Sequence, residues 1–115
     1  MNQMATMNVR AVDKAGIVDI QGELTAQAEQ ALSDAYARAS DGANAVILNF
    51  DGLEYMNSSG IGLLVTLLIR ANRQKKRLLT CGLSDHYRHI FQLTRLDDAI
   101  GIYATEADAL GAAAA

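Results

Sequence analysis

The spacing of apolar and polar residues predicts two strands at the start of the chain, followed by a helix. Residues 7–12 and 17–22 alternate apolar and polar side chains around a turn expected at residues 13–16, which is typical of an antiparallel hairpin at a sheet edge. From Thr25 the apolar positions recur every three or four residues, which indicates an amphipathic helix with Thr25 as N-cap and Gly42 at its end.

The next predicted elements are a buried strand and a second helix. Residues 45–50 are almost all apolar, which favours a short central strand covered on both faces. After a short connection, residues 57–60 precede a helix that is expected from Ile61 to near Gln74. The basic residues within 70–77 either form its solvated end or steer an acidic partner. Leu63 and Leu67 point away from the expected core stripe, so either a neighbouring helix covers them or a partner does. That stripe consists of Ile61, Leu64, Val65, Leu68 and Ile69.

The remaining chain predicts two further strands, each followed by a helix. Residues 77–81 and 102–104 are short strands, and helices are expected over 84–94 and 105–114. The order ββαβαβαβα implies right-handed crossovers and a mainly parallel sheet with helices packed on it. We therefore expect one α/β domain over residues 1–115, frayed at 1–6 and 111–115.

Composition narrows the classes of function. The 115 residues are half apolar and 20% charged, which suits one compact domain. A net charge of -3 gives no electrostatic footprint for nucleic acid. The longest apolar stretch, residues 61–69, is far shorter than the about 20 residues that cross a bilayer. Residues 1–7 show no secretory signal and cysteine occurs once, so we expect a cytoplasmic protein that is not membrane-embedded.

Candidate catalytic and metal chemistry is weak. Cys81 ends an apolar strand without a histidine partner in the sequence, which favours a small buried hydrophobic residue over a nucleophile. His86 and His89 lie three apart on a predicted helix, but a metal site needs about three ligands. Gly60 and Gly62 lack the spacing and the following lysine of a phosphate-binding loop. We therefore predict no catalytic residue, metal or cofactor.

The most informative stretch is residues 57–62, Asn-Ser-Ser-Gly-Ile-Gly, where the chain enters the second helix. The hydroxyl of Ser58 could cap this helix by accepting a hydrogen bond from a first-turn N–H group. The same position also suits a phosphate, because a helix N-terminus carries about half a positive charge. A phosphate on Ser58 would add about 1.5 to 2 negative charges and disrupt an apolar docking surface while sparing the fold. The residues alone leave both interpretations open.

The chain resembles a STAS domain of the bacterial anti-sigma factor antagonist type. The resemblance implies partner switching: the unphosphorylated protein binds an anti-sigma factor that is also a serine kinase and thereby frees a sigma factor. Phosphorylation ends the binding, and a phosphatase restores it. Ser58 matches the phosphoacceptor serine. The segments that carry the resemblance span nearly the whole chain and are residues 22–24, 48–50, 57–62, 81–84 and 91–94.

The resemblance also implies which residues meet the partner. Asn57, Ser59 and Gly60 would shape the loop around Ser58. Ile61 would supply an apolar contact, and Thr25 would lie nearby. The complete expected set is Thr25, Asn57, Ser58, Ser59, Gly60 and Ile61. Asn57 and Thr25 stand where the family usually has aspartate, so two negative charges are absent from the expected docking surface.

A second interpretation from the same resemblance is a STAS subunit that regulates the ATPase of an ABC-type lipid transporter. Both interpretations describe a regulator that binds proteins and is not an enzyme. The expected assembly is a monomer or a weak dimer.

Overall fold

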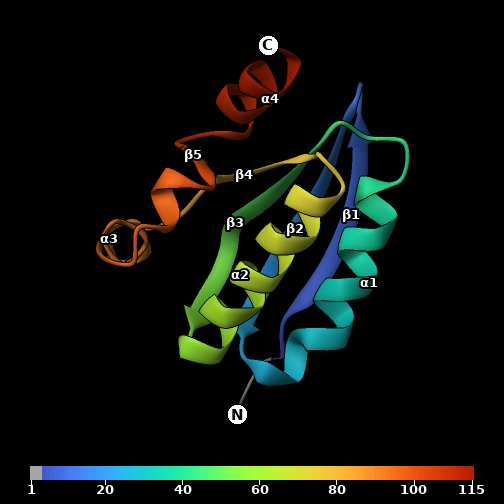
Figure 1. Ribbon diagram of the computed structural model, residues 1–115. Coiled ribbons are helices and arrows are strands. Elements are labelled where there is room, and N and C mark those ends of the chain that lie inside the picture. The colour runs from blue at the N-terminus through green and yellow to red at the C-terminus, as the bar shows by residue number, and fades with distance from the viewer. Residues whose placement is uncertain (1–3) are drawn as a thin grey trace.

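The chain begins with the predicted antiparallel hairpin, in a computed structural model that describes residues 4–115 (Figure 1). Strand β1 (Thr6–Val12) pairs with β2 (Ala15–Leu24), and β1 forms one edge of the sheet, as expected. The predicted turn over 13–16 is too long, because strand pairing resumes at Ala15 and leaves Asp13 and Lys14 between the strands. Residues 1–3, part of the segment expected to fray, lie outside the described residues.

Within residues 4–115, five strands form one sheet in the order β1-β2-β3-β4-β5, and all neighbours after the hairpin are parallel. The central strand β3 (Ala45–Met56) is twice as long as predicted, because its second half continues to pair with β2 across two register shifts. The short connection expected before the second helix is therefore strand. The sheet is completed by β4 (Arg77–Cys81) and β5 (Gly101–Tyr103). This arrangement confirms the predicted fold class, an α/β domain with a mainly parallel sheet.

Helices cover both faces of the sheet. On one face, α1 (Glu29–Ser40), α2 (Ser58–Arg73) and α3 (Asp85–Leu93) enclose the larger apolar core. On the other face, α4 (Glu106–Ala114) covers a smaller core through Ala109, and it lies apart from α1 and α2 in Figure 1. The short 3-10 helices η1 (Ala26–Ala28) and η2 (Leu96–Asp98) precede α1 and β5. The described α4 reaches Ala114, and the fraying expected at 111–115 stays a prediction.

The first helix does not begin as predicted. Thr25 stands before η1 rather than before α1, and its side chain makes no capping hydrogen bond. Its carbonyl instead accepts a hydrogen bond from Ala28 N–H at 2.9 Å, which closes the turn of η1. The predicted capping role of Thr25 is therefore wrong, because a turn of 3-10 helix separates this residue from α1.

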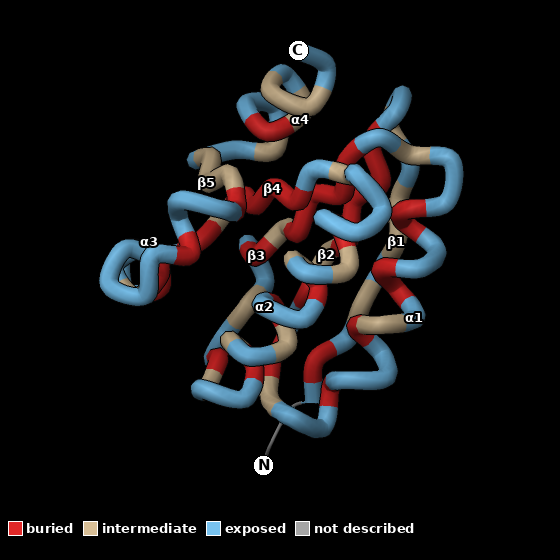
Figure 2. Tube along the Cα trace, in the orientation of Figure 1, coloured by how far each residue is buried: buried red, intermediate tan, exposed pale blue. Residues whose placement is uncertain are grey.

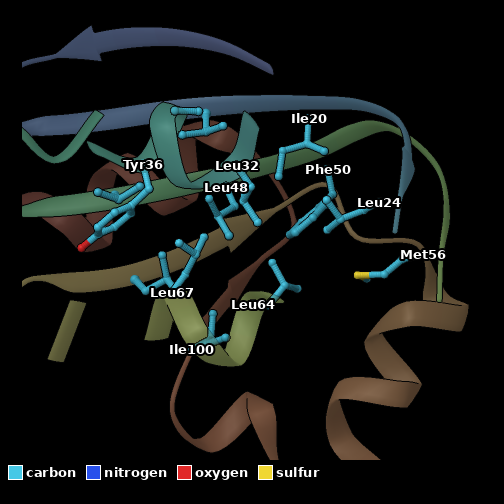
Figure 3. Close-up of a cluster of buried hydrophobic side chains, with 14 of the residues drawn as sticks. Ile20, Leu24, Leu32, Tyr36, Leu48, Phe50, Met56, Leu64, Leu67 and Ile100 are labelled. Carbon is cyan, nitrogen blue, oxygen red and sulfur yellow. The ribbon is translucent and has the colours of Figure 1, made fainter. Parts of the chain in front are cut away.

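The buried side of α2 differs from the predicted stripe. Leu64 and Leu67 are buried and point toward the sheet, where Figure 3 shows them near Leu48. Val65 and Ile69, which were expected to face the core, are 37% and 48% exposed. The error arises because both sides of this helix are apolar, so hydrophobicity alone does not fix its rotation. The remaining core positions of α2 are Gly60 and Ala71.

Candidate functional site: the exposed start of helix α2

Asn57, and not Ser58, caps helix α2. The side-chain oxygen of Asn57 accepts a hydrogen bond from Gly60 N–H at 2.9 Å. This bond satisfies one of the N–H groups that have no partner within the helix. The capping role considered for Ser58 is therefore wrong. Ser58 is the first residue of the helix and is exposed, so its hydroxyl is not used by the cap.

A close backbone contact fixes the start of α2 against the end of β2. Leu24 and Met56 are partners in the parallel register, and Asn57 N–H donates to the Leu24 carbonyl at 3.4 Å. Gly60 is buried, and a Cβ added there would lie 2.1 Å from the Leu24 oxygen. Real Cβ atoms do not approach an oxygen this closely, so only glycine fits. The sequence predicted Gly60 at the site but gave no sign of its contact with Leu24.

The first turn of α2 carries no acidic residue, in contrast to the other α-helices. Helix α1 has Glu29 in its first turn, α3 has Asp85, and α4 has Glu106. Acidic residues at these positions offset the positive end of the helix dipole. The first residues of α2 are serine and glycine, so no acidic residue of this helix offsets the partial positive charge around Ser58.

An exposed apolar surface extends from Ser58 along α2. It includes Val65 and Ile69, and Ile61 is half-buried at its start. Figure 2 shows exposed and intermediate positions on the side of α2 that faces away from the sheet. The neighbouring helix α1 covers only part of α2, where Leu32 and Leu63 line a groove between the two helices. Of the two residues predicted to need a cover, Leu63 is half-buried beside α1 and Leu67 is buried. The free apolar surface lies instead at Val65 and Ile69.

The other predicted site residues lie around the same corner of the molecule. Thr25 follows Leu24, and Asn57 follows Met56, so these two residues leave neighbouring strands at the same end of the sheet. Thr25 is half-buried and Ser59 is exposed. The sequence did not single out Tyr55, which precedes the site on β3 and is 47% exposed. The available signal was a large aromatic residue near the end of β3, in the segment that the sequence analysis had assigned to a connection.

The remaining candidates for chemistry, one cysteine and two histidines, lie away from the start of α2 on β4 and α3. Cys81 is a buried free thiol, and burial raises its pKa to about 11. A thiol with this pKa is almost fully protonated at neutral pH, which does not suit a nucleophile. His86 and His89 are exposed on α3, where His86 packs edge-on against Tyr87. Among residues 4–115, no group of three metal-ligating side chains comes together.

The basic run at the end of α2 is mostly tied to neighbouring elements. The guanidinium of Arg70 lies 4.7 Å from the ring centroid of Tyr36 on α1. Lys76 donates to the Ser40 carbonyl at the end of α1, and Arg77 donates to the Ala112 carbonyl of α4 at 2.6 Å. These contacts join α2 and β4 to the surrounding helices, so the run is more than a solvated helix end.

On the sheet face opposite α1 and α2, a cluster of polar residues links β1 and β2 to α4. Arg10 on β1 donates to Asp19 at 2.7 Å and to Glu106 at 2.6 Å. The hydrogen bonds from Arg10 hold the pKa of Asp19 down at about 2 and lower the pKa of Glu106. The hydrogen bond from Asn49 to Asp19 at 2.8 Å extends the cluster to β3. These interactions are structural and lie on the face that carries neither α1 nor α2.

Comparison with known proteins identifies the family. Residues 6–109 match the STAS domain family, and the chain belongs to it. The anti-sigma-B factor antagonist of Staphylococcus aureus is 31% identical over 91 residues, which cover 78% of this chain and 84% of that protein. No helix among residues 4–115 is long and apolar enough to cross a membrane.

Solved structures share the fold. An anti-sigma factor antagonist from Mycobacterium paratuberculosis matches with a TM-score of 0.85 and 23% identity, over 100% of both chains. The phosphorylated form of the Bacillus cell fate determinant SpoIIAA matches with a TM-score of 0.67 and 24% identity, over 92% of this chain and 97% of that chain. At these identities the matches establish the five-stranded architecture.

Proposed function

We propose that this protein is an anti-sigma factor antagonist that acts by partner switching in the cytoplasm. In its unphosphorylated form it binds an anti-sigma factor that is also a serine kinase, and a sigma factor is set free. Phosphorylation of Ser58 releases the partner, and a phosphatase restores binding. The observation that carries the proposal is an exposed Ser58 at the start of α2, beside an exposed apolar surface. Similarity to the Staphylococcus aureus anti-sigma-B factor antagonist supports it.

A phosphate on Ser58 would leave the fold intact. The first turn of α2 carries no carboxylate that would repel it. A negative charge near a helix N-terminus contributes about 0.3–1 kcal/mol of stability. The cap also survives modification, because Asn57 supplies it through its own side chain. Phosphorylation therefore changes the surface of the domain and not its core.

The same phosphate would oppose docking. Ser58 lies one helical turn from Ile61 and Gly62, so a partner that covers the apolar surface of α2 also covers the phosphate. A buried charge without a counter-ion is costly, and phosphorylation within an apolar interface weakens binding by desolvation and repulsion. One modification thereby separates two proteins without unfolding either.

The amide of Asn57 is compatible with this role. It supplies the oxygen that caps α2, as an aspartate would, but without a negative charge beside Ser58. The kinase that recognises this chain therefore meets a less acidic acceptor loop. We expect its contacts near Ser58 to be apolar or neutral.

A binding titration with the cognate anti-sigma factor tests the proposal. The wild-type protein and Ser58→Ala should bind equally, whereas Ser58→Asp should bind at least about tenfold more weakly. Thr105→Asp is the matched control: Thr105 caps α4 through its hydroxyl and is exposed, and aspartate keeps the cap while adding one charge. Equal binding by the wild type, Ser58→Ala and Ser58→Asp would contradict the switch.

Co-purification separates the proposal from the transporter alternative. A soluble histidine-kinase-like ATPase should accompany the chain if it is an antagonist, and the sigma factor that this binding sets free should stay behind. Recovery of an ABC-type ATPase with membrane proteins would instead support a STAS subunit of a lipid transporter and would overturn the proposal.

A further inference from the structure

Gly62 is a glycine that the fold does not need. It lies in the interior of α2 with an ordinary helical backbone, and a Cβ added there would meet nothing within 4 Å. Gly60, two residues earlier, has a clear structural reason in its contact with Leu24. A glycine in a helix interior costs about 0.5–1 kcal/mol relative to alanine. The domain bears this cost at Gly62 without any gain in its own packing.

Gly62 lies on the same side of α2 as Ser58. Positions four, seven and eleven residues after Ser58 follow one side of a helix. They are Gly62, Val65 and Ile69, and all three are exposed. No charged residue occurs in α2 before Arg70, so this side of the helix is uncharged along its first three turns. A helix side that is exposed and uncharged for this length indicates a protein contact.

We propose that Gly62 is the point at which the partner comes closest to the backbone of α2, where an uncharged apolar segment of the kinase packs between Ser58 and Val65. This inference rests on the proposed function and adds the position of closest contact. The missing side chain lets the partner reach the Cα of Gly62 and so bring its active site to Ser58, one turn away. Gly62 is thus a positioning residue for both docking and phosphorylation.

The contact at Gly62 is one of shape and not of hydrogen bonding. The Gly62 carbonyl already accepts a hydrogen bond from the Thr66 hydroxyl at 3.2 Å. Its N–H group points along the helix, so the surface open to a partner is the Cα and its hydrogens. An added methyl group would hold a close-fitting partner away, and overfilling a packed contact is unfavourable.

The test compares Gly62→Ala with Gly111→Ala. Gly111 is also exposed within a helix, α4, and a Cβ there would meet nothing within 4 Å. Both substitutions should raise Tm by roughly 2–5 °C, because each replaces an exposed helical glycine. Only Gly62→Ala should weaken binding of the anti-sigma factor kinase, by about tenfold or more, and slow phosphorylation of Ser58.

The outcomes separate this inference from the proposed function. Normal binding by Gly62→Ala, with the wild type also bound, would overturn the close contact and leave the switch intact. Equal weakening by Gly111→Ala would also overturn it, because the effect would then come from helix rigidity. If the wild type binds no anti-sigma factor, the proposed function fails and this inference fails with it. A raised Tm for Gly62→Ala excludes unfolding as the cause of lost binding.

Discussion

Gly60→Ala should destabilise the domain although alanine is the better helix former. The new Cβ would lie 2.1 Å from the Leu24 oxygen, 3.0 Å from the Leu24 carbonyl carbon and 3.0 Å from Met56 Cγ. The Met56 side chain can move, but the Leu24 carbonyl belongs to a paired strand and cannot. The first turn of α2 must therefore move away from the end of β2.

The magnitude follows from three contributions. Overpacking of a well-filled site costs about 1–3 kcal/mol. The hydrogen bond from Asn57 N–H to the Leu24 carbonyl, long already at 3.4 Å, weakens further as the helix moves, a loss of about 0.5–1 kcal/mol. The gain in helix propensity offsets about 0.5–1 kcal/mol. The free energy of unfolding should therefore fall by about 1–3 kcal/mol.

Urea unfolding measures this change directly. With a slope of about 1–3 kcal/mol per molar urea, the midpoint should fall by about 1 M while the slope stays constant. Gly62→Ala is the matched control, because it adds the same methyl group two residues later, in open space, and should raise the midpoint. A Gly60→Ala protein as stable as the wild type would refute the backbone contact that fixes Ser58.

Three further predictions concern the residue that caps α2, the stability of the domain in acid and the reactivity of Cys81. Asn57→Ala should lower the free energy of unfolding by about 1 kcal/mol in urea titrations, and Asn57→Asp should restore it, since aspartate also caps. The pKa of Asp19 is lowered to about 2 by Arg10, so its contribution to stability is present above pH 3.8 and lost as pH falls toward 2. Asp19→Asn should accordingly show a smaller loss of stability between pH 5 and 2, and an equal loss would count against the ion pair. Cys81, with its pKa raised to about 11, should react with a disulfide reagent at pH 7.5 only after urea is added.

Much of the fold could be predicted because each element has its own local signal. The alternating residues of the hairpin and the apolar run of β3 give the strands, and Ser84 caps α3 by accepting a hydrogen bond from Tyr87 N–H, as expected. The extent of β3 could not be predicted. Its second half contains Asp51 and Gly52, and it remains a strand because it pairs with the end of β2.

The start of α2 could be located in the sequence, but the details of the candidate site depend on tertiary packing. Ser58 could be placed at the start of α2 because the motif precedes an apolar helical run. Whether Asn57 or Ser58 caps the helix depends on backbone geometry, which composition does not show. Which side of α2 is exposed depends on how α1 packs against it, and so Val65 was predicted to be buried. The hydrogen-bonded ion pair between Arg10 and Glu106 joins residues 96 positions apart, so no local sequence pattern predicts it.

The most direct test compares one preparation of the protein before and after stoichiometric phosphorylation of Ser58 by its anti-sigma factor kinase. Calorimetry would give both Tm and the dissociation constant for the kinase. We expect an unchanged or slightly higher Tm and binding weakened at least about tenfold. Unchanged binding after phosphorylation, or a domain that unfolds when phosphorylated, would contradict the claim that Ser58 is a surface switch at the start of α2.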